Sequence, residues 1–188
     1  MNKKVSIIIL TWNGLEFTKK CLDSLKDTVN DAMITTYVVD NGSTDGTVEY
    51  LKELDWIRVI ENKENLGFVR GNNVAINQIK DDDIILLNND IIVEQADWVS
   101  VLQQTAYEKK DTGIVGCRLI NEKREFLHAG TYICPETYWG QQIGGGQKDI
   151  GQYSDNREVE GVVFACAYIK REVINKIGGL NEAFFSYF

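Results

Sequence analysis

Residues 84–93 constrain the fold of this chain more than any other stretch. They read Ile-Ile-Leu-Leu-Asn-Asn-Asp-Ile-Ile-Val, an apolar run typical of a buried strand that two amides and one carboxylate interrupt. Buried polar groups cost free energy unless something bonds to them. We therefore expect Asn88, Asn89 and Asp90 to lie at the end of a sheet, where a cation or a polar ligand meets them. The alternative is a polar β-turn between two short strands, which Asn-Asn-Asp also favours.

The apolar spacing along the chain predicts an α/β fold. Short apolar runs that suit buried strands occur at residues 5–10, 35–39, 57–60, 84–87, 114–115 and 162–169. Helical spacing occurs between them, beginning near residue 15 and again at residues 47–54, 69–79, 98–107 and 171–177. Strands that alternate with helices imply a Rossmann-like, mostly parallel sheet with helices on both faces. Residues 120–158 break the pattern, and we expect an irregular excursion or short hairpins there, over the ligand-binding edge of the sheet.

Polar residues follow three of the predicted strands. Thr11 ends the first, Asp40 ends the second, and Asn88–Asp90 end the fourth. Ligands of parallel sheets bind at the carboxyl ends of the strands, so these side chains should converge on one edge. The first strand is followed by neither Gly-x-Gly-x-x-Gly nor a Walker A lysine loop, which disfavours a dehydrogenase and a P-loop enzyme.

Asn13, Asp45, Arg70 and His128 have candidate local roles. Asn13, with Glu16 three residues later, matches a helix N-cap with a capping box. Asp45 is better suited to capping the helix at residue 47 than to binding a ligand. Arg70 could pair with a diphosphate in bidentate fashion, or be a solvated helix arginine. His128, the only histidine, is more simply a structural histidine than a ligand or base.

Composition narrows the class of partner. The chain of 188 residues carries 28 acidic and 20 basic side chains, a formal net charge of −8. This balance argues against a nucleic-acid partner held by phosphate contacts. It also implies that a phosphorylated ligand needs a local cation, and a carboxylate beside amide oxygens suits Mg²⁺ or Mn²⁺. The four cysteines are far apart, which predicts buried free thiols and a cytoplasmic protein. No stretch approaches the length that spans a bilayer.

Taken in order, five blocks of this sequence resemble the family 2 glycosyltransferases of the GT-A fold. The blocks are Val5-Ser6-Ile7-Ile8-Ile9-Leu10-Thr11-Trp12-Asn13, Val38-Val39-Asp40-Asn41-Gly42-Ser43-Thr44-Asp45-Gly46-Thr47, Asn65-Leu66-Gly67-Phe68-Val69-Arg70-Gly71-Asn72-Asn73, Leu86-Leu87-Asn88-Asn89-Asp90 and Gly178-Gly179-Leu180-Asn181-Glu182-Ala183-Phe184-Phe185. The resemblance runs from residue 5 to residue 188. It implies a single nucleotide-sugar-binding catalytic domain over residues 1–188.

The resemblance also implies an activity and a set of roles. The activity is metal-assisted transfer of a sugar, with inversion, from a nucleotide-diphosphate donor, UDP- or dTDP-linked, to the hydroxyl of a glycan or lipid-linked acceptor in polysaccharide biosynthesis. It implies a cytoplasmic enzyme, at the inner face of the membrane in its full-length form. Thr11 and Asp40 would hold the base and ribose, Asn13 would support the first loop, and Arg70 would approach the diphosphate. Asn88-Asn89-Asp90 takes the place of the Asp-x-Asp motif, with Asp90 binding Mg²⁺ or Mn²⁺. Asn88 departs from the acidic first position, which removes one charge from the metal site.

The end of the chain departs from the family pattern. Related enzymes continue after this point with an acidic pair that includes the catalytic base, so we expect a truncated enzyme whose base lies just beyond Phe188. The fragment would then bind its donor and transfer sugar poorly; Glu182 is a weaker candidate for the base. The aromatic segment 184–188 could also associate with a partner. This leaves a second hypothesis, a non-catalytic nucleotide-binding or interaction module, while a nucleotidyltransferase would need a basic, glycine-rich loop after the first strand.

Overall fold

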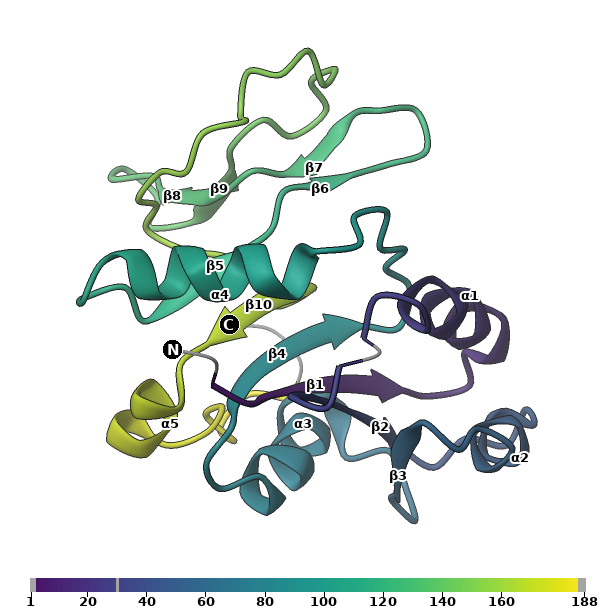
Figure 1. The fold of residues 1–188 in the computed structure, drawn as a ribbon. Coiled ribbons are helices and arrows are strands. Elements are labelled where there is room, and N and C mark those ends of the chain that lie inside the picture. The colour runs from purple at the N-terminus through teal and green to yellow at the C-terminus, as the bar shows by residue number, and fades with distance from the viewer. Residues whose placement is uncertain (1–2, 30, 186–188) are drawn as a thin grey trace.

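The computed structural model describes residues 3–29 and 31–185, and its centre is a six-stranded sheet with strand order β3-β2-β1-β4-β10-β5 (Figure 1). Four parallel strands form one side of it, β1 (Val5–Thr11), β2 (Ile34–Asp40), β3 (Ile57–Glu61) and β4 (Asp83–Asn88). Beyond β4, the strand β10 (Cys166–Ile169) runs antiparallel to both β4 and β5 (Ile114–Gly116). The sheet is therefore mostly parallel, as the sequence predicts.

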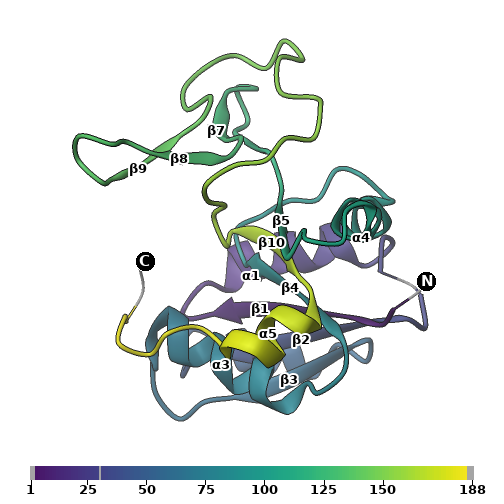
Figure 2. The ribbon, with the colours of Figure 1, turned by 90° about the vertical axis from the view of Figure 1, so that its left-hand side faces the viewer.

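Helices cover both faces of this sheet, which explains why its central strands are apolar at consecutive positions. One face packs Ile7 and Ile9 of β1 against α1 (Leu15–Leu25), α2 (Thr47–Lys52) and α4 (Trp98–Glu108). The other face packs Ile8 against α3 (Gly67–Gln78) and α5 (Arg171–Ile177). Figure 2 shows α4 and α3 on opposite sides of the strands. Side chains that alternate along β1 thus enter two different cores.

Two local predictions are wrong. Asn13 does not cap α1: the residue at that position is Gly14, and no side-chain cap bond is made there. The strand predicted over residues 162–169 is confined to Cys166–Ile169. Of the alternative offered for residues 84–93, a turn between two short strands, the turn is present, because the N–H of Ile91 donates to the carbonyl of Asn88 (3.3 Å), whereas residues 91–93 form no strand. Asn13 bonds to Thr44 and the N–H of Val163 faces His128, and local patterns do not encode such distant contacts.

The excursion, residues 117–161, consists of short hairpins, as predicted. It pairs β6 (Leu119–Ile120) with β7 (Phe126–His128), and β8 (Thr131–Ile133) with β9 (Gly140–Gln142). Phe126 is fully buried and meets the ring of Tyr153 edge-on at 5.0 Å. Contrary to expectation, the hairpins extend past the β5 side of the sheet rather than across the carboxyl ends of β1 and β2 (Figures 1 and 2).

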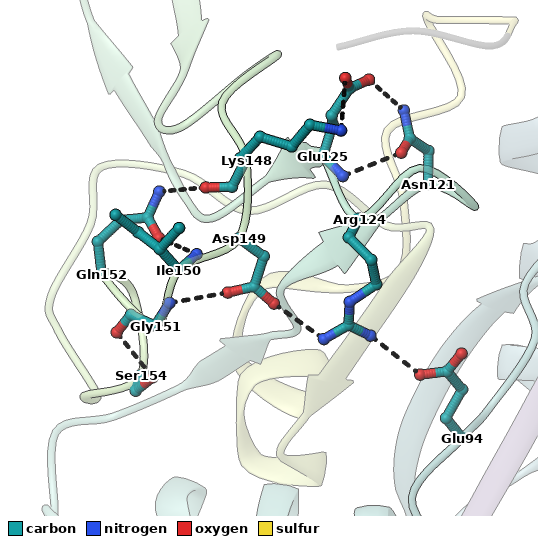
Figure 3. A network of polar contacts seen from close by, with 10 residues as sticks. All are labelled: Glu94, Asn121, Arg124, Glu125, Lys148, Asp149, Ile150, Gly151, Gln152 and Ser154. Carbon is teal, nitrogen blue, oxygen red and sulfur yellow. Dashed lines mark hydrogen bonds and ion pairs between the residues drawn. The ribbon is translucent and has the colours of Figure 1, made fainter.

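A polar network holds the excursion together and joins it to the loop after β4 (Figure 3). Arg124 lies between two carboxylates, 3.2 Å from Asp149 within the excursion and 3.5 Å from Glu94 in that loop. Lys148 pairs with Glu125 at 3.3 Å. Most of these side chains are well exposed, so each pair contributes little stability alone. The network links the hairpins to the loop after β4 and does not form a second large core.

The four cysteines are free thiols, of which Cys21 and Cys166 are buried. Burial raises the pKa of Cys21 to about 12, with a further contribution from the nearby Asp90 carboxylate. Cys117 and Cys166 face each other across β5 and β10 with their sulfur atoms 3.1 Å apart. Among residues 3–29 and 31–185, no helix is both long and apolar enough to cross a membrane.

Candidate functional site

The carboxyl ends of β1, β2 and β4 meet at one edge of the sheet. The strand register places Thr11 beside Asp40 and Leu10 beside Asn88. The amide of Asn89 donates to the hydroxyls of Thr11 (3.2 Å) and Thr18 (3.1 Å), which ties the loop after β4 to β1 and α1. The convergence predicted from the sequence is therefore present, because these strands are parallel and end at the same level.

Asp40 is a buried carboxylate whose hydrogen-bonding capacity the protein satisfies only in part. It is 1 % exposed, and its Oδ2 accepts hydrogen bonds from the backbone N–H groups of Gly42 (3.0 Å) and Ser43 (2.9 Å). Its Oδ1 has no hydrogen-bond partner within the described ranges. A buried acceptor without a donor is costly, and such groups call for an explanation. A ligand N–H or O–H that reached this oxygen would satisfy it.

Asp83, at the opposite end of β4, provides the contrast. It is fully buried, and it accepts bonds from the hydroxyls of Tyr107 (2.7 Å) and Tyr168 (2.6 Å) and from the backbone N–H of Arg171 (2.7 Å). Burial and the bond to Asp83 raise the pKa of both tyrosines, so they remain donors. Both oxygens of Asp83 are occupied by the protein itself. Among the described residues, Asp40 at the carboxyl edge is the only buried carboxylate with an oxygen that lacks a hydrogen-bond partner.

The loops after β1 and β2 are fastened to each other. Asn13, in the left-handed region at φ 48°, accepts a bond from the N–H of Thr44 (2.8 Å), and its own N–H donates to the Ser43 hydroxyl (2.9 Å). Asp45 accepts from the N–H of Leu15 (3.0 Å) and from the N–H of Thr47 (3.2 Å), so it serves the first turns of both α1 and α2. The predicted capping of α2 by Asp45 holds only in part, because Gly46 occupies the N-cap position and Asp45, one residue earlier, bonds the N–H of Thr47. Asn13 supports the first loop.

Asn41 is a central residue that the sequence reading did not single out. It is 2 % exposed, and its amide donates to Asn65 Oδ1 (2.8 Å) and to the carbonyl of Gly67 (3.2 Å). Its oxygen accepts from Asn62 Nδ2 (3.1 Å) and the N–H of Leu66 (3.1 Å). The feature of the sequence that could have pointed to Asn41 is an amide side chain directly after an apolar strand. Asn41 joins the end of β2 to the start of α3.

Asn88, Asn89 and Asp90 form a turn at the tip of β4, so the turn chemistry anticipated as an alternative is present. Asn88 and Asn89 are half-buried and Asp90 is exposed. Thr11, by contrast, is 1 % exposed, and its hydroxyl bonds to Thr18 (2.8 Å) as well as to Asn89. Direct contact of Thr11 with a ligand stays a prediction, whereas Asp90 is open to solvent and to a ligand.

Arg70 belongs to the same edge through α3. Gly71, the next residue, lies against Leu10 and Asn41, at the ends of β1 and β2. The Nε of Arg70 is 3.6 Å from a carboxylate oxygen of Glu182, and both side chains are more than half exposed. Glu182 also accepts a bond from Asn73 Nδ2 (3.0 Å). The expected general base beyond Phe188 and part of the aromatic segment 184–188 lie outside the described residues.

Other candidate centres do not compete with this edge. His128 is 2 % exposed, with Nδ1 bonded to Gln142 and Nε2 facing the N–H of Val163 (3.5 Å), as a structural histidine would be. In the part of the chain that the structure describes, no group of three or more His, Cys, Asp or Glu side chains is arranged to hold a metal. A surface hollow of about 700 Å³ runs along α4 and is lined by residues that include Gln104, Thr105 and Asn156, none of which belongs to the converging side chains.

Comparison with known proteins gives a consistent family. The family model described as "Glycosyl transferase family 2" matches residues 6–178. The low-salt glycan biosynthesis hexosyltransferase Agl10 of Haloferax volcanii is 25 % identical over 98 % of this chain and 58 % of its own length. The O-antigen biosynthesis protein RfbC of Myxococcus xanthus is 26 % identical over 96 % of this chain and 15 % of its own length. This chain thus spans well under two thirds of these relatives.

Solved structures show the same architecture. The mannosyltransferase PcManGT from Pyrobaculum calidifontis, solved in complex with GDP-Man and Mn²⁺, superposes with a TM-score of 0.69 at 18 % identity, over 95 % of this chain and 48 % of that one. S. aureus TarS 1-349 in complex with UDP-GlcNAc superposes with a TM-score of 0.53 at 20 % identity, over 64 % of this chain and 38 % of that one. At these identities the likeness establishes the fold.

Proposed function

Because this chain belongs to glycosyltransferase family 2, we propose that its carboxyl edge binds the nucleoside diphosphate of a sugar donor and takes part in transfer of that sugar to an acceptor hydroxyl. The observation that carries the proposal is the convergence of the Thr11, Asp40 and Asn88–Asp90 tips on one edge. The edge is where ligands of parallel sheets bind. The spare oxygen of Asp40 is suited to an imide N–H of a uracil- or thymine-type base or to a ribose hydroxyl.

The residues present fit a hard divalent cation held jointly with the ligand. Asp90 offers an exposed carboxylate, and Asn88 and Asn89 lie beside it at the tip of β4. Since one carboxylate cannot complete an octahedral shell, diphosphate oxygens and water must supply the remaining ligands. Mg²⁺ and Mn²⁺ bind in this shared manner. Binding of the cation and binding of the diphosphate should therefore depend on each other.

The proposed chemistry requires charge stabilisation at the leaving group. A bound cation would offset the negative charge that develops on the diphosphate as the glycosidic bond breaks. Arg70 would add a guanidinium from the side of α3, where it can form two hydrogen bonds to phosphate oxygens. Inversion requires a carboxylate that removes the acceptor proton from the opposite face. Glu182 is already engaged by Arg70 and Asn73, so we assign no general base among the described residues.

The test is calorimetric titration of the chain with UDP, dTDP and GDP, each with and without Mn²⁺. We expect one of them to bind, and Mn²⁺ to strengthen its binding. Asp40→Ala should weaken binding about tenfold or more with or without Mn²⁺, the loss expected for a hydrogen bond to a charged group. Asp90→Ala should abolish the Mn²⁺ effect and leave metal-free binding unchanged.

The matched control is Asp81→Ala, which removes a carboxylate near the opposite end of β4. It should bind as the unaltered chain does. Absence of binding for all three nucleotides, or equal losses in Asp81→Ala and Asp90→Ala, would refute the proposed site.

A further inference from the structure

A segment far along the chain, residues 179–185, crosses the beginning of α3 and brings a carboxylate to Arg70. Glu182 Oε2 lies 3.6 Å from Arg70 Nε, and Glu182 Oε1 accepts a hydrogen bond from Asn73 Nδ2 at 3.0 Å. We propose that Glu182 is a positioning residue that orients the guanidinium of Arg70 toward the donor diphosphate. The inference rests on the proposed function, which places that diphosphate at the carboxyl edge.

Asn73 fixes the N-terminal end of this segment. It is only 6 % exposed, and its amide bonds both backbone groups of Leu180, donating to the carbonyl (2.9 Å) and accepting from the N–H (2.8 Å). A Cβ on Gly179 would lie 2.5 Å from Asn73 Oδ1, so the backbone approaches more closely than any other residue would permit. The same buried amide that anchors Leu180 also holds Glu182. The carboxylate is thus held on a rigid support.

The C-terminal end of the segment is held at the first turn of α3. A Cβ on Gly67 would lie 2.6 Å from the carbonyl oxygen of Phe185, and Gly67 has φ +77°. The N–H of Val69 points to that carbonyl at 3.4 Å. Glu182 therefore lies between two attachment points, both on the helix that carries Arg70. The distance between the two charges is set by the fold.

The geometry of the pair leaves Arg70 able to bind a ligand. An arginine has five N–H donors in a planar fork, and Glu182 faces the one on Nε. Within residues 3–29 and 31–185, no other group pairs with Arg70, so both terminal nitrogens remain available for phosphate oxygens. An exposed arginine loses side-chain entropy when it is ordered on binding. A carboxylate that already restricts the guanidinium reduces that loss, which is preorganisation for binding.

Both oxygens of Glu182 are committed to Arg70 and Asn73, which argues for positioning and against proton transfer. The ion pair is exposed, and exposed pairs contribute little to folding stability. Replacing Glu182 should therefore change diphosphate affinity and leave thermal stability unchanged. This difference separates positioning from a purely structural role.

The experiment titrates the chain with UDP, dTDP and GDP in Mn²⁺ and continues with whichever binds. Glu182→Gln keeps the shape and the bond to Asn73 and removes the charge. We expect about threefold to tenfold weaker binding of the diphosphate, the range of an exposed ion pair or slightly more. Binding of the matching nucleoside, which has no phosphate, should not change, and Glu182→Asp should restore part of the loss. In the Arg70→Ala background, Glu182→Gln should have no further effect.

The outcomes are separable. If no diphosphate binds the unaltered chain, the proposed function fails, and this inference fails with it. If one binds and Glu182→Gln binds it equally well, the inference alone is wrong. Tighter binding by Glu182→Gln would show that the carboxylate competes with phosphate for Arg70. An equal loss of affinity in the Arg70→Ala background would show that Glu182 acts without Arg70. Either result overturns the inference.

Discussion

The parallel half of the molecule, residues 5–108, and the excursion, residues 117–161, are stabilised differently. In the parallel half, Ile7, Ile8 and Ile9 of β1 are fully buried, and the loops at the carboxyl edge are joined by buried amides such as Asn41. In the excursion the strands are two or three residues long, and β9 is exposed throughout. The comparison indicates that a well-packed scaffold carries the candidate site. The hairpins beside it depend on few buried contacts, such as that between the rings of Phe126 and Tyr153.

The largest expected contrast comes from replacing an isoleucine with alanine in each of the two regions. Ile8→Ala empties a site between β1 and α3 and should cost about 3–4 kcal/mol of unfolding free energy. Ile133→Ala, in β8, changes a side chain that is 40 % exposed and should cost about 1 kcal/mol or less. Urea denaturation of each variant measures both values. Equal losses would contradict the comparison.

A second substitution tests whether the excursion unfolds on its own. Phe126→Ala removes the fully buried ring of β7 and should destabilise the excursion by about 3 kcal/mol. Amide hydrogen exchange should accelerate in residues 119–147 and stay unchanged in β1 and β4. Leu127→Ala, at the neighbouring and 55 % exposed position, is the matched control and should leave exchange unaltered. Faster exchange in β1 would show that the two regions unfold together.

The smallest expected effect concerns the loops of the carboxyl edge and depends on pH. Burial acts to raise the pKa of Asp45, but hydrogen bonds from Thr47 and Leu15 outweigh it and lower the pKa below its ordinary value. Its stabilisation is therefore fully present above the unfolded pKa of about 3.9, and it is lost as pH falls through the folded value. Because Asp45 is exposed, Asp45→Asn should cost only about 0.5 kcal/mol at pH 7.

This cost should shrink as the pH falls below about 3.9 and through the lower folded pKa, as followed by thermal unfolding across the pH range. The control is Asp155→Asn, at an exposed aspartate of the excursion, which should unfold as the unaltered chain does. A constant difference for Asp45→Asn at all pH values would contradict the assignment.

Sequence reasoning predicted the parallel half well for a physical reason. Its strands are continuous apolar runs and its helices have regular spacing, so local pattern and global burial agree. The same reasoning placed Thr11, Asp40 and Asn88–Asp90 together, because parallel strands end at one edge. The family resemblance added what the pattern cannot, namely the expectation that this edge meets a nucleotide sugar.

The errors and omissions all involve contacts between residues distant in sequence. Asn13 resembles a helix cap, but Thr44, in the loop after β2, occupies its side-chain oxygen. Asn41 gave no periodic signal, although four hydrogen bonds meet at its amide. The link between Asn73 and Glu182 spans 109 positions. Such pairs depend on how α3 and the segment after α5 pack, which spacing along the chain does not specify.

The central claim is that the tips of β1, β2 and β4 form one cation and nucleotide site. Paramagnetic broadening by Mn²⁺ of amide NMR signals, in the presence of the nucleotide that binds, tests it most directly. We predict selective broadening of Thr11, Gly42 and Asn89, with Asp83 at the opposite end of β4 and Tyr138 in the excursion unaffected. Broadening centred on Asp83 or on the excursion, with Thr11 and Asn89 unchanged, would contradict the account.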